Sequence, residues 1–407
     1  MSEAASLGSA VSAPATADDA AGRRWRLAWV IIALSGLYAV GYVLMWLPGA
    51  DGGDDFFIFW SAGHWMAEHG LTPPLFDLEI FHAYQEELFG GTGPYHPLPY
   101  PPTLAPALTP FAAVPLGWAY AGSMMVTLAL FLGLTASREP SRTLGLLVSP
   151  ASLTVIIVGQ IAFLSSALLL GGLRLVRRHP KIAGVLLGLL SVKPQLGLLV
   201  PVALIAFRAW RTFLVATVVT VILPVPSVLI GGPDVWLAWL KLMPAIANHL
   251  AHAADSSAPQ MVSPAAALLV AGVPLHVAEL IQVPITLALA AVAYVACRRN
   301  GPSEMTVAML GVASLLATPY AWFYNLLIAA FAAVVLAEAG LRTGFRRWEV
   351  LAVLLAWVLP VLAIAEIGPP GTYSLALVLL LVVLLRRIAG EGGVAAVAVG
   401  AGDQVRA

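Results

Sequence analysis

Residues 27–47, LAWVIIALSGLYAVGYVLMWL, form an uncharged run of 21 residues close to the start of the chain. The run is longer than the roughly 7–15 residue core of a cleavable signal peptide, and about 20 apolar residues cross a bilayer as a helix. Arg23, Arg24 and Arg26 precede it. Because cytoplasmic flanks carry the cations, the pattern predicts a retained signal anchor with its N-terminus in the cytoplasm.

The segment that follows this run has the opposite charge character. Residues 48–103 hold eight acidic residues and neither Lys nor Arg. By the positive-inside rule, this first loop faces away from the cytoplasm. It opens with the adjacent carboxylates Asp54 and Asp55, and a carboxylate pair at a membrane surface indicates chemistry.

The composition of the whole chain is that of a membrane protein. Hydrophobic residues make up 60% and charged residues 10% of the sequence, with a mean hydropathy of +0.90. Soluble domains have about 45–50% apolar and about 25% charged residues. A formal net charge of zero gives no electrostatic case for nucleic acid. The single cysteine, Cys297, excludes an intrachain disulfide and a thiolate metal site.

Clusters of cations between the later apolar runs mark the expected cytoplasmic turns. Six such clusters imply about twelve crossings, and therefore an all-α, polytopic membrane protein. The clusters are Arg138 with Arg142, residues 174–181, Arg208 with Arg211, Arg298 with Arg299, residues 342–347, and Arg386 with Arg387. Two runs, 144–158 and 182–192, are shorter than about 20 residues, so we expect helices that break inside the membrane.

The domain organisation follows from these features. We expect residues 1–22 to be a disordered cytoplasmic N-terminus, because they contain almost no large apolar groups. Residues 23–388 form a single transmembrane domain with extracytoplasmic loops at 48–103 and 231–262. Residues 389–407, a Gly/Ala/Val stretch, are predicted to be a flexible tail. No soluble domain is indicated.

Two amphipathic stretches lie in the first outer loop. Phe56–His69 and Leu78–Phe89 are bounded by glycine and proline, so each is predicted to be a short helix along the bilayer surface. Together they would cover a site built by this loop.

An ordered set of motifs makes the chain similar to a known family, glycosyltransferase family 87. These motifs are Asp55-Phe-Phe-Ile-Phe-Trp-Ser-Ala-Gly63, Gly70, Leu75-Phe76-Asp77, Tyr100-Pro101-Pro102, Pro110, Gly159-Gln160, Gly184 with Gly188, Lys193-Pro194 and Arg208-Ala-Trp-Arg211. The similarity runs from about residue 50 to about residue 330. It implies a C-type glycosyltransferase architecture and a mannosyltransferase that uses a polyprenyl-phosphate-linked sugar donor and a glycolipid or glycan acceptor.

The resemblance also implies roles for the carboxylate pair. Asp55 is expected to be the general base that deprotonates an acceptor hydroxyl, in a single displacement that inverts the anomeric centre. Asp54 would orient Asp55 or raise its pKa by like-charge repulsion. The alternative is that both acids merely solvate a loop end. No cofactor is expected.

Three further residues are candidates for substrate binding. Lys193 lies between two short apolar runs, where a lipid phosphate would offset the cost of its burial; the alternative is a snorkelling lysine. Gln160 follows a break at Gly159 and either binds phosphate or sugar oxygens or caps a helix. Tyr100, before two prolines, shapes a turn or lines a sugar pocket.

The remaining candidates lie in later outer turns. His249 and His252 are spaced to share a helix face and are candidates for acceptor contact. Tyr324 and Asn325 occupy the place where the family usually has an acidic residue or histidine, and Ala162 replaces an expected Asn; both departures concern the acceptor. A divalent-ion site from Asp54 with His64, Glu68, His69, His82 and His96 is an alternative that lacks tight ligand spacing, and solvated histidines fit better.

Other functions stay open at this point. A transferase of arabinofuranose or glucose would need the same phosphate-binding and hydroxyl-activating groups. A lipid or sugar transporter would also be polytopic, but it usually shows a repeat between halves, and none is evident. The expected location is the plasma (inner) membrane, with the active site on the extracytoplasmic side.

Overall fold

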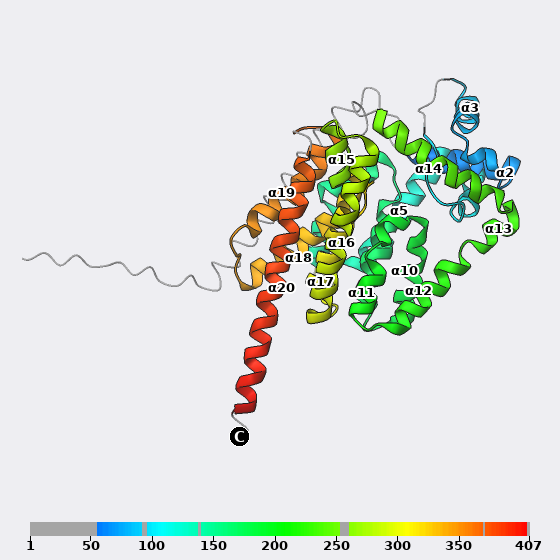
Figure 1. The fold of residues 1–407 in the computed structure, drawn as a ribbon. Coiled ribbons are helices and arrows are strands. Elements are labelled where there is room, and N and C mark those ends of the chain that lie inside the picture. The colour runs from blue at the N-terminus through cyan, green and yellow to red at the C-terminus, as the bar shows by residue number, and fades with distance from the viewer. Residues whose placement is uncertain (1–54, 92–95, 137–139, 253–259, 369–370, 405–407) are drawn as a thin grey trace, which may run out of the picture. The chain divides into compact units, whose positions relative to one another are not determined.

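The computed structural model describes residues 55–91, 96–136, 140–252, 260–368 and 371–404. Within these ranges the chain is helical and contains no named strand, so the all-α prediction is confirmed for the described part (Figure 1). The predicted first crossing, residues 27–47, and the N-terminal segment 1–22 lie outside the described residues.

Short helices alternate with long ones along the chain. In the first half the α-helices are α2 (Phe56–His69), α3 (Leu78–Phe89), α4 (Ala105–Leu108), α5 (Leu116–Thr135), α6 (Pro140–Leu147), α7 (Pro150–Val158), α8 (Ala162–Ser166), α9 (Gly172–Leu175), α10 (Pro180–Leu189), α11 (Val200–Ala206) and α12 (Trp210–Ile222). In the second half they are α13 (Val225–Gly231), α14 (Asp234–His252), α15 (Pro264–Val270), α16 (Leu275–Asn300), α17 (Glu304–Ala317), α18 (Leu327–Thr343), α19 (Glu349–Ile364) and α20 (Thr372–Gln404). Single turns η4 (Leu190–Val192), η5 (Pro194–Gly197) and η7 (Phe323–Leu326) mark the breaks that matter for the site.

The described helices include several that are long and apolar enough to cross a membrane. Five meet this criterion, and the pair α6 and α7, bent by 47°, adds a sixth if it is one broken span. Five shorter apolar segments of 10–17 residues accompany them. In the first short run, α6 ends at Leu147 and α7 begins at Pro150; in the second, one apolar segment runs from Pro180 to Val192. That these helices break inside the membrane stays a prediction. The chain is therefore a membrane-embedded protein, and the number of crossings, predicted as about twelve, stays a prediction.

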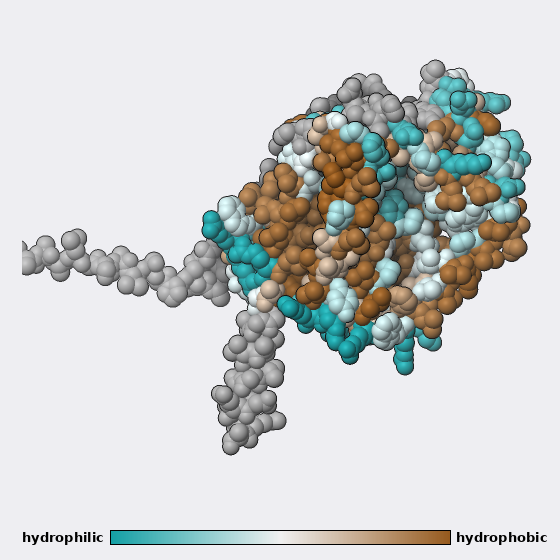
Figure 2. All heavy atoms as spheres, in the orientation of Figure 1, coloured by the Kyte–Doolittle hydropathy of each residue, from teal (hydrophilic) through white to brown (hydrophobic). Residues whose placement is uncertain are grey.

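Helices α17 and α18 form the centre of the fold. Every residue of α17 from Met305 to Ala317 is buried, and α17 packs against α16, α18 and α20 (Figure 1). By contrast, only 6% of the most apolar window in residues 210–231 is buried. An apolar helix with so little protein around it faces lipid. Figure 2 shows apolar residues across the middle of the visible face, and hydrophilic residues at its lower rim.

The helices of the first outer loop have the predicted bounds, Phe56–His69 and Leu78–Phe89. Helix α3 buries only Phe81 and Gln85, one turn apart, as a surface helix should. Helix α2 differs from the expectation, because most of its residues are buried. Its polar Ser61 hydroxyl accepts from Gln85 Nε2 at 3.0 Å and donates to the Phe57 carbonyl at 2.7 Å, so it is satisfied inside the protein. Helix α2 is thus a core element, and α3 covers it.

Two glycines bring α10 and α12 into close contact. A Cβ atom on Gly184 would lie 2.8 Å from the carbonyl oxygen of Thr212, and one on Gly188 would lie 2.8 Å from that of Ala216. Glycines four residues apart on one face let two helix backbones approach in this way. Because α10 leads directly into η4 and then into Lys193, this packing also helps to fix the position of Lys193.

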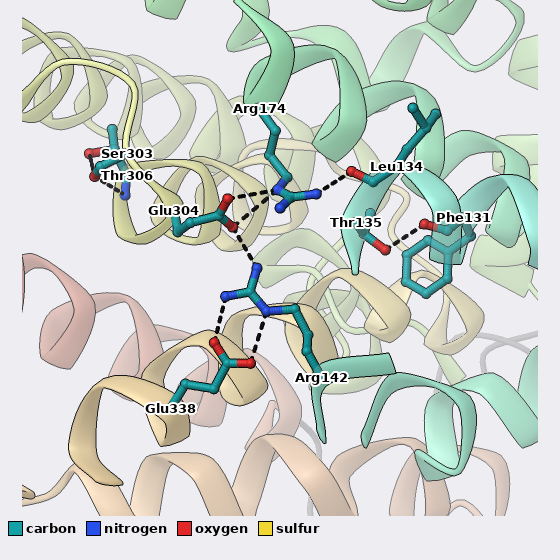
Figure 3. Close-up of polar contacts among 9 residues, drawn as sticks. All are labelled: Phe131, Leu134, Thr135, Arg142, Arg174, Ser303, Glu304, Thr306 and Glu338. Atoms are coloured by element: carbon teal, nitrogen blue, oxygen red, sulfur yellow. Dashed lines mark hydrogen bonds and ion pairs between the residues drawn. The ribbon is translucent and has the colours of Figure 1, made fainter. Parts of the chain in front are cut away.

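A network of ion pairs joins four helices where the predicted cytoplasmic cations gather (Figure 3). Arg142 of α6 contacts Glu338 of α18 at 2.5 Å and Glu304 of α17 at 2.8 Å. Arg174 of α9 contacts Glu304 at 2.9 Å and also donates to the Leu134 carbonyl at the end of α5. Cations that were predicted only as topology markers therefore also hold helices together.

Helix α20 continues to Gln404, so the backbone of residues 389–404 is helical. The predicted flexibility of residues 389–407 stays a prediction. Residues 389–404 contain no proline, which would stop the helix that begins in the preceding apolar run.

Candidate active site

Asp55 lies where the start of one helix meets the end of another. It is the N-cap of α2, and its backbone N–H donates to the carbonyl of Val158, the last residue of α7, at 3.1 Å. An N-cap Asp normally accepts a hydrogen bond from its own helix, but this carboxylate makes no such bond. The partly buried carboxylate is therefore available to a partner from another element.

That partner is Gln160, which follows the helix-ending Gly159. Gly159 has a φ of 82°, the left-handed conformation that commonly ends a helix and turns the chain. The turn allows Gln160 Nε2 to donate to Asp55 Oδ2 at 2.8 Å. Gln160 is buried, so its amide has few alternatives to this contact.

The other end of the Gln160 amide is held by Tyr100. The Tyr100 hydroxyl donates to Gln160 Oε1 at 2.7 Å, and the backbone N–H of Ile161 donates to the same oxygen at 3.3 Å. Two donors on Oε1 leave Nε2 facing the carboxylate. Tyr100 is itself buried and packs against Phe59 of α2, with ring centroids 5.3 Å apart. The order Tyr100, Gln160, Asp55 is thus a continuous hydrogen-bonded chain.

Lys193 lies at the break between η4 and η5. Pro194 disfavours helical backbone at the preceding residue and lacks an N–H, which accounts for the break. Lys193 is only 2% exposed. Its Nζ donates to Asn325 Oδ1 at 2.9 Å and lies 4.7 Å from the centre of the Tyr324 ring. No carboxylate of the described residues forms an ion pair with it. A buried ammonium with an amide oxygen and an aromatic face beside it is suited to an anionic ligand.

A short backbone bridge positions the segment that carries Tyr324 and Asn325. Met261 pairs with Trp322 as an isolated antiparallel bridge, with Val262 N–H donating to the Ala321 carbonyl at 2.7 Å. Trp322 in turn lies parallel to Tyr324, at 4° between ring planes and 6.3 Å between centroids. The end of the second outer loop therefore helps to position the Tyr324 ring that Lys193 contacts.

The environment of Asp55 changes its acidity. Burial raises the pKa of the carboxyl from 3.8 to about 6, while the Gln160 hydrogen bond and the charge of Lys193 lower it. Burial, followed by the charge of Asp55, raises the pKa of Tyr100, so this phenol stays protonated and can donate. A carboxylate with a pKa of about 6 is ionised at pH 7 and is close to the pKa range that suits a general base.

Six predicted site residues therefore come together from five separate segments of the chain: Asp55, Tyr100, Gln160, Lys193, Tyr324 and Asn325. Asp54 lies outside the described residues. His249 and His252 belong to the last turn of α14, and their side chains are outside the described part of the structure.

The alternative divalent-ion site is not assembled within the described residues. No group of three or more His, Cys, Asp or Glu side chains there could hold a metal ion. The ring of His64 contacts that of Trp60, and His69 stacks on Trp65. His82 instead pairs with Glu86 at 3.4 Å.

Sequence reasoning missed two features of this site. It treated Tyr100 and Gln160 as separate candidates, although they form one hydrogen-bonded unit with Asp55. It also gave no role to the backbone bridge between Met261 and Trp322. The only available signal was Ser263-Pro264, a helix start whose Ser263 hydroxyl donates to the Pro319 carbonyl.

The fold and these contacts define a class: a polytopic helical membrane protein with one carboxylate and one buried lysine where its helices break. The model of glycosyltransferase family 87 matches residues 98–319, more than half of the chain. The chain belongs to glycosyltransferase family 87 and is a membrane glycosyltransferase. The match includes Tyr100, Gln160 and Lys193, whereas Asp55 lies before it. Neither a curated protein nor a solved structure matched the chain.

Proposed function

We propose that this glycosyltransferase moves a hexose, with mannose as the first candidate, from a polyprenyl-phosphate-linked donor to a glycolipid or glycan acceptor. The reaction would take place on the extracytoplasmic face of the plasma membrane. The observation that carries the proposal is the convergence of Asp55 with Lys193, from segments 138 residues apart, at the helix breaks.

In this proposal the two charged groups divide the chemistry. The acceptor oxygen attacks C1 of the donor sugar, and its proton passes to the Asp55 carboxylate. The bond between C1 and the phosphate oxygen breaks, and its electron pair leaves with the polyprenyl phosphate. A single displacement of this kind inverts C1. The donor already carries a good leaving group, so a base and phosphate stabilisation are sufficient.

Lys193 and Asn325 form the proposed phosphate site. Its ammonium is desolvated, and an anion in low dielectric interacts strongly with such a charge. Asn325, 1% exposed, has no acceptor for its Nδ2 among the described residues, so this donor is also available to a phosphate or sugar oxygen. Tyr324 would support the lysine from its ring face.

A comparison of three lipid-linked sugar donors tests the proposal. The full-length protein in lipid vesicles is given radiolabelled polyprenyl-phosphate mannose, glucose or arabinofuranose, together with a membrane-lipid extract as acceptor. We expect label from the mannosyl donor to enter a glycolipid, with the anomeric configuration inverted. Preference for another lipid-linked sugar would change the donor assignment. Use of a nucleotide sugar, or uptake of the intact donor without transfer, would contradict the proposal.

A further inference from the structure

A cavity of about 430 Å³ lies at the arginine-rich end of the molecule, away from the candidate active site. The end of α16, the chain after α9 and the chain after α11 surround it. Three arginines line it, Arg177, Arg298 and Arg299, together with the apolar residues Phe207 and Cys297. Within the described residues, no acidic side chain lines this cavity.

These three arginines differ from the structural arginines of the same protein. Arg142, Arg174 and Arg387 are each paired with a carboxylate within 2.9 Å. In the part of the chain that the structure describes, none of the three cavity arginines has a carboxylate partner. All three are exposed, so water screens their mutual repulsion, but together they give the cavity a positive potential that attracts an anion.

The backbone at Gly301 shapes the cavity for a guanidinium. Gly301 ends α16 with a φ of 64°, a conformation that glycine adopts readily. A Cβ atom at this position would lie 2.6 Å from Arg177 Nη2. Arg177 therefore packs against bare backbone, beside the arginines that end α16. The planar guanidinium presents paired N–H groups that match phosphate oxygens.

The surroundings of the cavity favour a lipid as the source of that phosphate. Large apolar side chains are exposed on α16, including Leu287 at 65% and Val295 at 45%. The neighbouring α12 exposes Leu214 at 64% and Val218 at 45%. A phosphate held at the polar ends of such helices would leave acyl chains lying along apolar surfaces. Basic pockets between membrane helices bind anionic headgroups in this arrangement.

We propose that the cavity formed by Arg177, Arg298 and Arg299 binds the phosphate headgroup of an anionic membrane phospholipid. This lipid site is separate from the proposed sugar-transfer site. Helix α17 runs from Glu304, just after the cavity, to Ala317, just before the segment that carries Tyr324. Its 14 residues span roughly 21 Å at 1.5 Å per residue.

Native mass spectrometry of the purified full-length protein with added lipid tests this site. We expect phosphatidylglycerol to bind more tightly than phosphatidylcholine. The double variant R298Q/R299Q should raise the dissociation constant for phosphatidylglycerol by about tenfold or more, because charge-assisted hydrogen bonds are lost. The variant R177K, which keeps the charge but loses the paired N–H groups, should give an intermediate loss.

The matched control is Arg178→Gln, because Arg178 is exposed like the three cavity arginines but does not line the cavity. It should leave phosphatidylglycerol binding unchanged within about twofold. If Arg178→Gln weakens phosphatidylglycerol binding as much per removed charge as R298Q/R299Q does, the attraction is diffuse and the proposal is overturned. Displacement of the lipid by equimolar inorganic phosphate would assign the cavity to free phosphate instead. Equal affinities for phosphatidylcholine and phosphatidylglycerol would also overturn the proposal of an anionic-lipid site.

Discussion

The protonation state of Asp55 is the residue-scale feature on which the proposed reaction depends. Burial raises its pKa to about 6, so lowering the pH through this value converts the proposed base to its inactive acid. We therefore expect the transfer rate under kcat/KM conditions to fall about tenfold per pH unit below about pH 6. A pH–rate profile with purified protein and lipid-linked donor measures this. A rate that stays constant down to pH 4.5 would exclude such a base.

Tyr100→Phe should move the acidic limb of the pH–rate profile, the part where the rate falls below about pH 6, to higher pH. Removing the hydroxyl takes one of two donors from Gln160 Oε1, so the amide can turn its oxygen toward Asp55 and disfavour the carboxylate. We expect a shift of up to about one pH unit, which corresponds to about 1.4 kcal/mol. Tyr84→Phe, which loses only a contact with Glu68, is the control. A fall in rate without any shift of the limb would limit Tyr100 to a structural role.

Lys193→Gln should weaken binding of the donor. The proposed phosphate site loses its charge, and we expect the KM for the polyprenyl-phosphate donor to rise about tenfold or more. The comparison is Lys241→Gln on α14, because Lys241 is exposed and, like Lys193, lies outside both the predicted cytoplasmic clusters and the predicted tail. Similar KM values for the two variants would place the donor phosphate elsewhere.

At the scale of elements, the close packing of α10 against α12 can be tested by adding one methyl group. Gly188→Ala places a Cβ within 2.8 Å of the Ala216 carbonyl oxygen and still closer to the Val219 side chain. We expect a loss of about 1–3 kcal/mol in unfolding free energy and a lower denaturation temperature in detergent. Gly133→Ala on α5, where no neighbouring atom lies within 4 Å, should be neutral or slightly stabilising. Equal effects of the two substitutions would contradict the packing argument.

Local sequence signals predicted the breaks in the helices but not the partners that the breaks bring together. Gly159 and Pro194 end helices for backbone reasons that a sequence displays directly. The contact of Lys193 with Asn325 joins residues 132 positions apart, which no local pattern contains. Likewise, the burial of α2 depends on Gln85 satisfying Ser61, so its amphipathic pattern alone suggested a surface helix.

At the scale of the whole molecule, charge placement predicted the orientation but not the internal pairing of the charges. The positive-inside rule uses the position of Arg142 and is silent about Glu304 and Glu338, whose carboxylates bind it. The same rule predicts opposite sides for the first outer loop and the cavity arginines. This orientation is testable because Cys297, the only cysteine, is buried.

A cysteine-labelling experiment in intact cells measures the orientation. In a Cys297→Ala background, Gly91→Cys should react with an impermeant maleimide, because position 91 lies in the acidic first loop. Arg178→Cys should react only after the cells are permeabilised. The opposite pattern would place the acidic loop in the cytoplasm, where nucleotide sugars are available, and would remove the reason for a lipid-linked donor.

The most direct measurement of the central claim is the transfer rate of Asp55→Asn with a polyprenyl-phosphate mannose donor. Its control is Asp234→Asn, the same change at an exposed carboxylate outside the site. Because the folded pKa of Asp55 is raised, ionising it costs stability as pH rises from about 4 to about 6, so the variant should fold at least as well at neutral pH. We predict a rate at least about a hundredfold below that of the control. Transfer by Asp55→Asn at a rate close to that of the control would contradict the account.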